Sequence, residues 1–405
     1  MESTSFSRTD AKLLYRRLDS LFGGMDPNRP QRRLLESFLD DLYRSFKDDL
    51  HLRSAVLYAE RRDRFNLVRY CGESLVPLAK HLDPSHMYLR LLIEHRAYIY
   101  ADPQNSDSPG AQGIFPAYPA AAILIGQQPQ RFLMFFLLDP GWVREELDFV
   151  LNTVRAALGT RLAEERVRGS MREAARIQQS LLPRQLPTFN GYEIACRSIP
   201  AEEVGGDFYD FVPFSKETLG LSLGDASGHG LPAALLVRDV VTGLRMGLEI
   251  DMKAGFVLSK LNRVVHRSNL SSRFISVFYG ELESEGSLFY VNAGHQPPIL
   301  FGAGQPVELD VGGTVIGPLP EVRFQRGFAR MDPGSLLVLF TDGVIERRSR
   351  AGDLYAVDRL KEMVMANRAL PATDILERLF QASFLFGEGG PWEDDATAMI
   401  IKRLS

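Results

Sequence analysis

An apolar run that borders an aspartate recurs in the second half of this chain, and it limits the folds open to the sequence. Residues 219–223 are typical of a buried strand and lead into Gly224-Asp225, and residues 336–340 lead into Thr341-Asp342-Gly343. A single Asp-Gly or Gly-Asp pair more often marks a turn. Several strand-edge acids in one domain predict instead that the side chains gather at one end of a sheet. The acids are Asp207, Asp225, Asp342 and Asp394 or Asp395.

Carboxylates brought this close repel one another unless cations lie between them. Oxygen ligands held on rigid elements are what a hard divalent cation requires. Zinc would instead favour histidine or cysteine ligands. The sequence therefore predicts a site for Mn²⁺ or Mg²⁺.

Five ordered motifs resemble those of the metal-dependent protein phosphatase family (PPM, type 2C), in its bacterial SpoIIE/RsbU-like branch. The resemblance covers about residues 170–405, and the segment 175–183 before the first motif is also typical of that branch. The motifs are Val204-Gly205-Gly206-Asp207-Phe208-Tyr209-Asp210, Gly224-Asp225-Ala226-Ser227-Gly228-His229-Gly230, Asn292-Ala293-Gly294-His295-Gln296-Pro297-Pro298, Thr341-Asp342-Gly343-Val344-Ile345-Glu346 and Asp394-Asp395-Ala396-Thr397.

The resemblance implies an α-β-β-α sandwich and a protein serine/threonine phosphatase that uses water activated by two divalent cations. It implies that Asp225 bridges both cations and that the backbone carbonyl of Ala226 binds one of them. Asp207 would bind the second cation, and Asp342 would bind the first together with Asp394. Asp395 competes with Asp394 for that last role, and the sequence leaves the choice open.

The proton donor for the leaving group is not assigned by these motifs. Family members outside this branch place a histidine two residues after the bridging aspartate, where this chain has Ser227. His229 is a possible general acid, whereas His295 more often fits a turn-stabilising role. A catalytically silent signalling scaffold is the alternative function. The presence of an acid at every matched position favours an active enzyme.

The 405 residues suggest two domains, and the overall class is α+β. After an N-terminal helical segment (1–28), residues 29–158 show a helix, two strands, a helix and loop, and further strands. This order resembles a GAF sensor domain, with a PAS-like domain as the second possibility. A small ligand or a dimer contact would lie against its sheet, with residues 102–119 as a lid. A helical linker (159–187) then leads to the phosphatase domain (188–405).

The helix that leaves the sensor domain begins near Val143. Its apolar residues follow a 4-3-4 spacing, which indicates a coiled coil that would hold two chains together as a homodimer. An amphipathic helix that packs on its own domain is the alternative. Gly159 and Gly169 each weaken the helix by about 1 kcal/mol. The spaced residues are Leu147, Leu151, Val154, Leu158, Val167, Met171 and Ala174.

Composition limits the partners and the compartment. A net charge of −4 gives no indication of a nucleic-acid partner. Two distant cysteines suit a reducing cytosol, and no apolar run is long enough to span a membrane, so we expect a soluble cytoplasmic protein. The expected substrate is a phosphoserine or phosphothreonine on a regulatory protein. By family resemblance this would be a STAS-type anti-sigma-factor antagonist.

Overall fold

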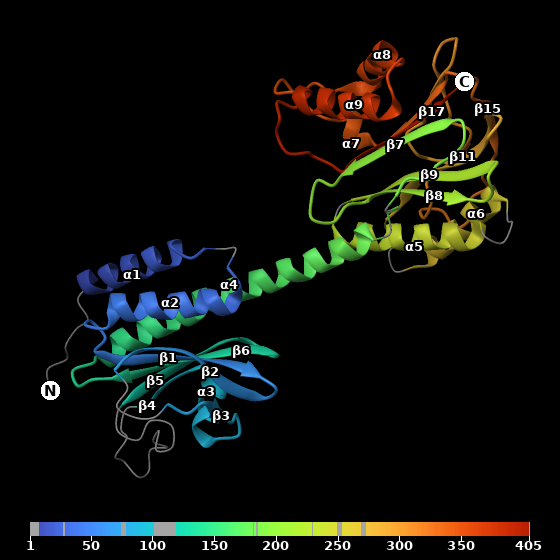
Figure 1. The fold of residues 1–405 in the computed structure, drawn as a ribbon. Helices are drawn as coiled ribbons and strands as arrows, with labels where there is room; N and C mark the ends of the chain where they lie inside the picture. Colours follow the sequence, from blue (N-terminus) through green and yellow to red (C-terminus); the bar gives the residue numbers. More distant parts are fainter. Residues whose placement is uncertain are drawn as a thin grey trace. The chain divides into compact units, whose positions relative to one another are not determined.

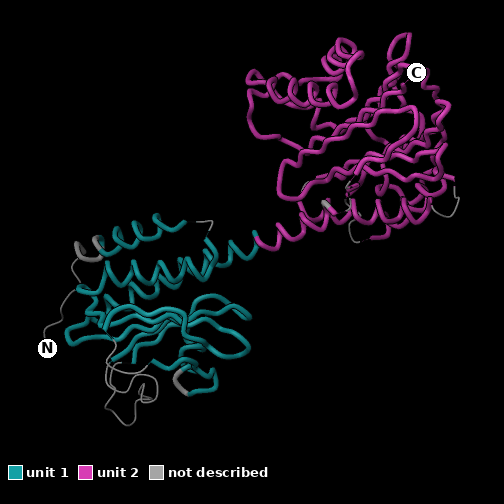
Figure 2. Tube along the Cα trace, viewed as in Figure 1, with its two compact units in different colours: residues 1–168 teal, residues 169–405 magenta. Residues whose placement is uncertain are grey.

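The computed structural model of the chain describes residues 8–26, 29–73, 78–100, 119–180, 182–183, 185–228, 230–248, 253–268 and 273–404. These residues form two compact units, 1–168 and 169–405 (Figure 2). The boundary between the units falls inside the segment predicted as the linker. No helix among the described segments is long and apolar enough to cross a membrane.

The first unit is built on a six-stranded antiparallel sheet with the order β3-β2-β1-β6-β5-β4. Helices α1, α2 and α4 pack on one face of this sheet, and α3 lies on the other (Figure 1). Side chains of β1 alternate between the two faces of the sheet. Ala55 and Leu57 pack in the core under the three helices, whereas Val56 and Tyr58 pack in the core on the opposite face. The elements are α1 (Arg8–Gly23), α2 (Gln31–Phe46), β1 (Leu52–Arg61), β2 (Arg64–Gly72), β3 (His81–Leu82), α3 (Met87–His95), β4 (Ala97–Tyr100), β5 (Ala120–Gln127), β6 (Gln130–Leu138) and α4 (Arg144–Gln179).

The N-terminal segment is part of this unit, because Leu14 and Leu18 of α1 are buried in the core under the helices. The sequence pattern did not indicate the two-residue strand β3. The lid predicted at residues 102–119 lies, except for residue 119, outside the described residues. The likeness of this unit to a GAF domain stays a prediction.

Helix α4 is continuous over 36 residues and passes through both Gly159 and Gly169. Leu147, Leu151, Val154 and Leu158 are buried in the first unit's own core. The coiled-coil interpretation is therefore wrong for this half of the helix, which is an amphipathic helix packed on its own sheet. In the second half, the side chains of Val167 and Met171 are exposed.

The second unit is the predicted sandwich of two sheets with helices outside. One sheet has the order β14-β11-β10-β9-β8, with β15 beside β11, and the other has the order β13-β12-β16-β17-β7. Helices α5 and α6 pack against the first sheet, and α8 and α9 against the second (Figure 1). Apolar side chains from both sheets, among them Leu223, Phe278, Leu337 and Met399, fill the space between them.

Most elements of this unit agree with the sequence pattern, but β13, β14, β15 and the short helix α7 were not predicted. The elements are β7 (Tyr192–Ile199), β8 (Asp207–Pro213), β9 (Thr218–Ala226), α5 (Leu231–Leu248), α6 (Ala254–Arg267), β10 (Ile275–Glu283), β11 (Ser287–Ala293), β12 (Ile299–Phe301), β13 (Val307–Glu308), β14 (Gly312–Gly313), β15 (Gly327–Arg330), β16 (Leu336–Phe340), α7 (Asp342–Ile345), α8 (Ala356–Asn367), α9 (Ala372–Phe386) and β17 (Ala396–Arg403).

Candidate metal centre

Two carboxylates face each other on adjacent strands. Asp207 begins β8, Asp225 is the last residue but one of β9, and the two are paired in the antiparallel register. Asp207 is only 5% exposed; its Oδ2 accepts a 2.8 Å hydrogen bond from Thr341 Oγ1, while its Oδ1 is buried and has no hydrogen-bond partner among the described residues. Burial, and then the nearby Asp225, raises the pKa of Asp207 well above the usual range. A bound cation would give this buried oxygen a partner of opposite charge.

The second sheet supplies further acids to the same place. Asp342 is the first residue of α7 and is separated from β16 by Thr341, and Asp394 lies in the bend before β17. Burial and then Asp394 raise the pKa of Asp342 to about 6. Burial, followed by the charges of Asp342 and Asp394, raises the pKa of Asp225 to about 8. The four predicted acids thus act on one another electrostatically, as a site built for positive charge requires.

Asp394 and Asp395 point to different surroundings. Asp395 is 5% exposed, and its carboxylate accepts hydrogen bonds from the backbone N–H groups of Ala201, at 2.8 Å, and Gly206. Asp394 is exposed and accepts a 2.8 Å bond from the backbone N–H of Asp395. Both oxygens of Asp395 are therefore occupied by the chain, whereas Asp394 keeps an oxygen for another partner.

Neighbouring atoms lie so close to residues 205 and 206 that only glycine fits at these two positions. A Cβ on Gly205 would lie 2.7 Å from Asp395 Oδ2. A Cβ on Gly206 would lie 2.8 Å from the carbonyl oxygen of Ala226 and 3.5 Å from Asp225 Oδ1. The missing side chain at Gly206 therefore leaves space beside two of the oxygens that the sequence predicts as ligands.

The donor set fits Mg²⁺ or Mn²⁺. Within the described segments, no three acidic, histidine or cysteine side chains are already arranged as a cage around one point. Mg²⁺ usually keeps several waters and binds through one or two carboxylates, so a set of paired carboxylates and one backbone carbonyl suits it. Oxygen donors also match these ions better than zinc.

The other predicted residues have structural surroundings. Asp210 forms a two-point ion pair with Arg245, at 2.7 and 2.8 Å. Ser227 Oγ accepts a 2.9 Å bond from the backbone N–H of Phe274, so this hydroxyl stabilises the local backbone. His295 is buried, and its backbone N–H donates a 2.7 Å bond to Asn292 Oδ1. Burial lowers the pKa of His295 to about 4. His229, the possible general acid, lies outside the described residues.

Three residues near the site were missed by sequence reasoning. Thr341 is buried and donates to Asp207, as described above, while also accepting a 2.9 Å bond from the backbone N–H of Thr397. Gln178, in the last turn of α4, accepts a 3.1 Å bond from the backbone N–H of Gly205 and donates to its carbonyl. The Thr-Asp-Gly motif gave a signal for Thr341, but nothing local indicates that Gln178 reaches residue 205.

Arg347 is the third of these residues. Its side chain is fully buried, and its guanidinium forms a 2.5 Å ion pair with Glu393 and donates to the carbonyls of Pro391 and Gly390. The ring of Trp392 lies 5.0 Å from the guanidinium carbon. The buried guanidinium group of Arg347 therefore holds the loop that leads into Asp394.

The fold and the acidic site together define a metal-dependent phosphatase domain of the PP2C type. Residues 215–404 match the family model of stage II sporulation protein E (SpoIIE). The C-terminal unit is thus similar to the SpoIIE family of protein serine/threonine phosphatases.

Individual proteins show the same relationship. The phosphoserine phosphatase RsbU of Bacillus subtilis is 28% identical over 243 residues, which are 59% of this chain and 72% of RsbU. Protein IcfG of Synechocystis is 26% identical over 284 residues, 63% of this chain but only 45% of IcfG. The solved SiaA-PP2C domain of Pseudomonas aeruginosa shares the fold with a TM-score of 0.53 and 21% identity, over 60% of this chain and 99% of that domain.

Proposed function

We propose that this protein hydrolyses a phosphoserine or phosphothreonine on a regulatory protein, with two divalent cations held at the acidic site. The observation that carries the proposal is the buried, unpartnered Oδ1 of Asp207 opposite Asp225. A phosphoryl group brings further negative charge to a site whose carboxylates already repel. Divalent cations, when bound, would supply both an activated water and neutralisation of the phosphoryl oxygens.

The residues divide into ligands and positioning groups. Asp225 and the Ala226 carbonyl, with Asp207, Asp342 and Asp394, are the proposed ligands, in agreement with the roles implied by the family resemblance. Asp395 is a positioning group, because its oxygens are occupied by Ala201 and Gly206. Thr341 orients the Asp207 carboxylate and leaves the other oxygen of that residue facing the site.

The substrate class is proposed from relatives and from the site. RsbU is named as a phosphoserine phosphatase, and a protein-bound phosphoserine suits an acidic site that carries its own cations. A STAS-type anti-sigma-factor antagonist is the specific substrate that we propose. Direct comparison of such a phosphoprotein with a short phosphoserine peptide would test this choice, since a docking protein should be hydrolysed with a much higher kcat/KM.

We also propose that the first unit regulates the phosphatase through α4. Gln178 in the last turn of this helix is hydrogen-bonded to both backbone groups of Gly205, two residues before Asp207. A movement of this turn would therefore shift the backbone that carries a proposed ligand. The exposed Val167 and Met171 leave room for a homodimer contact through the second half of α4.

The test is hydrolysis of a phosphoserine peptide by the full chain, with Mn²⁺, with Mg²⁺ and with a chelator. We expect turnover only with a divalent cation, and its loss in Asp225→Asn. Asp239→Asn is the matched control, because Asp239 is an exposed carboxylate that pairs with its neighbour Arg238. Turnover by Asp225→Asn equal to the unsubstituted chain would refute the site, and no turnover under any condition would support the silent scaffold instead.

A further inference from the structure

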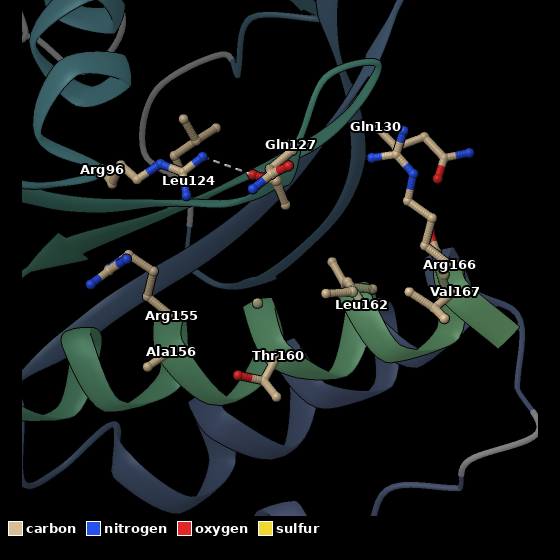
Figure 3. Close-up of a pocket in the computed structure, with 14 residues that line it drawn as sticks. Arg96, Leu124, Gln127, Gln130, Arg155, Ala156, Thr160, Leu162, Arg166 and Val167 are labelled. Atoms are coloured by element: carbon tan, nitrogen blue, oxygen red, sulfur yellow. Dashed lines mark hydrogen bonds between the residues drawn. The ribbon is translucent and has the colours of Figure 1, made fainter. Parts of the chain in front are cut away.

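A cavity of about 490 Å³ lies in the first unit, between α4 and the hairpin that joins β5 to β6. This volume is within the range of about 300–1,000 Å³ typical of small-molecule sites. The cavity lies between α4 and the sheet, on the sheet face that α1, α2 and α4 cover (Figure 3). Gly159 helps to open it, since a Cβ at this position would have no atom within 4 Å.

Three arginines line the cavity, and none of the lining residues in the described part of the chain is acidic. Arg155 and Arg166 extend from α4, and Arg96 comes from the position after α3 (Figure 3). The Arg96 side chain donates a 3.1 Å bond to the carbonyl of Gly126, and the Arg155 side chain donates long bonds of 3.4 and 3.5 Å to Asn152 Oδ1. These contacts leave the positive charges uncompensated.

The contrast with other arginines of the same unit is clear. Arg17, Arg53, Arg69 and Arg131 each form an ion pair with a carboxylate at 2.7, 2.7, 2.8 and 2.5 Å, respectively. Across the described residues, no such pair forms at the three cavity arginines. The helix itself offers none, because the residues three and four positions from Arg155 and Arg166 are all uncharged.

The remaining lining residues complete a site for more than a bare ion. Gln31, Gln127 and Gln130 bring amide groups that can donate and accept hydrogen bonds, and Leu162 and Val167 bring apolar surface. Arginine forks match the oxygen geometry of phosphate groups. We propose that this cavity binds a phosphorylated small molecule of nucleotide size, with the phosphate at Arg166, beside Gln130, and the organic part against the other amide and apolar groups (Figure 3).

Calorimetric titration of the full chain with each of the four common nucleoside monophosphates tests the proposal. A chelator is kept present, so that the acidic site of the second unit repels these anions. At least one nucleotide should bind once per chain with a Kd below about 1 mM. The matching nucleoside and inorganic phosphate should each bind at least about tenfold more weakly. Because binding alone is measured, the outcome is independent of the proposed phosphatase activity.

Two matched pairs of variants locate the binding. Arg166→Gln should weaken binding by about tenfold, whereas Arg161→Gln should not, because Arg161 is on the same helix but pairs with Glu164 and does not line the cavity. Gly159→Leu should abolish binding by filling the cavity, and Gly169→Leu, on an equally open stretch of α4, should leave it unchanged. Equal binding by both members of either pair, or no binding of any nucleotide at about 5 mM, would overturn the proposal.

Discussion

Replacement of Asp225 by asparagine should stabilise the metal-free protein while it removes the proposed activity. The pKa of Asp225 is raised to about 8 in the folded chain by burial and by the nearby Asp342 and Asp394, against an ordinary value of 3.8. A folded-state pKa above the unfolded value means that folding takes up a proton between these limits. The stability contributed by this group is thus complete below about pH 4 and is lost as the pH rises through 8.

The size of the effect follows from the same shift. One pKa unit corresponds to about 1.36 kcal/mol, so the pKa difference sets an upper value of about 4 kcal/mol at pH 7. Water and side-chain relaxation reduce such energies, so we expect the free energy of unfolding of Asp225→Asn to exceed that of the unsubstituted chain by about 2–4 kcal/mol. The difference should shrink toward zero near pH 4.

The assay is chelator-treated denaturant unfolding at several pH values. The chain has two tryptophans, Trp142 in the first unit and Trp392 in the second, so a Trp142→Phe background makes fluorescence report the second unit alone. Asp239→Asn serves as the control for removal of an exposed charge. Mn²⁺ at about 1,000 times Kd should reverse the order, since it adds about 4.1 kcal/mol to a chain that binds it. An Asp225→Asn variant no more stable than the unsubstituted chain at pH 7.5 would refute the reasoning.

Three further predictions concern the groups around the site. Asp394→Asn should weaken Mn²⁺ binding at least about tenfold and leave the free energy of unfolding unchanged. Asp395→Asn should lower the free energy of unfolding by about 1–3 kcal/mol, because the backbone N–H groups that its carboxylate accepts from are buried. Equal changes in Mn²⁺ affinity and in unfolding free energy for both variants would contradict this division of roles. Arg347→Met should cost about 2–4 kcal/mol, measured by denaturant unfolding, because the carbonyls that it holds lose their donor; a cost below about 0.5 kcal/mol would contradict this. Gln178→Ala should lower kcat more than it changes unfolding free energy, as steady-state kinetics and unfolding would show together, and normal turnover would contradict a link through α4.

The gathering of the acids could be predicted from the sequence because each borders a strong local pattern. Gly224-Asp225 and Thr341-Asp342 border apolar strands of the two facing sheets, and these strands bring both acids to the same site. The choice between Asp394 and Asp395 could not be made in this way. It depends on the backbone N–H groups of Ala201 and Gly206, which are almost two hundred residues away along the chain.

The exit helix shows a different limit of sequence reasoning. Leu147, Leu151, Val154 and Leu158 form an apolar stripe that suits both a second helix and a sheet. The sheet of the first unit covers the stripe, and a pattern within one helix carries no information about which partner will do so. Gln178 was missed for a related reason, since its contact with Gly205 spans 27 residues and leaves no periodic signal.

The pairing of Asp207 with Asp225 makes the chemistry depend on strand alignment. Side chains alternate between the two faces of a strand, so a shift of β8 against β9 by one residue would turn one of the two acids to the opposite face. The turn at residues 214–217 joins the two strands and sets their register, so a one-residue insertion there should separate the two acids. Length variation among active relatives should accordingly preserve the register of this hairpin.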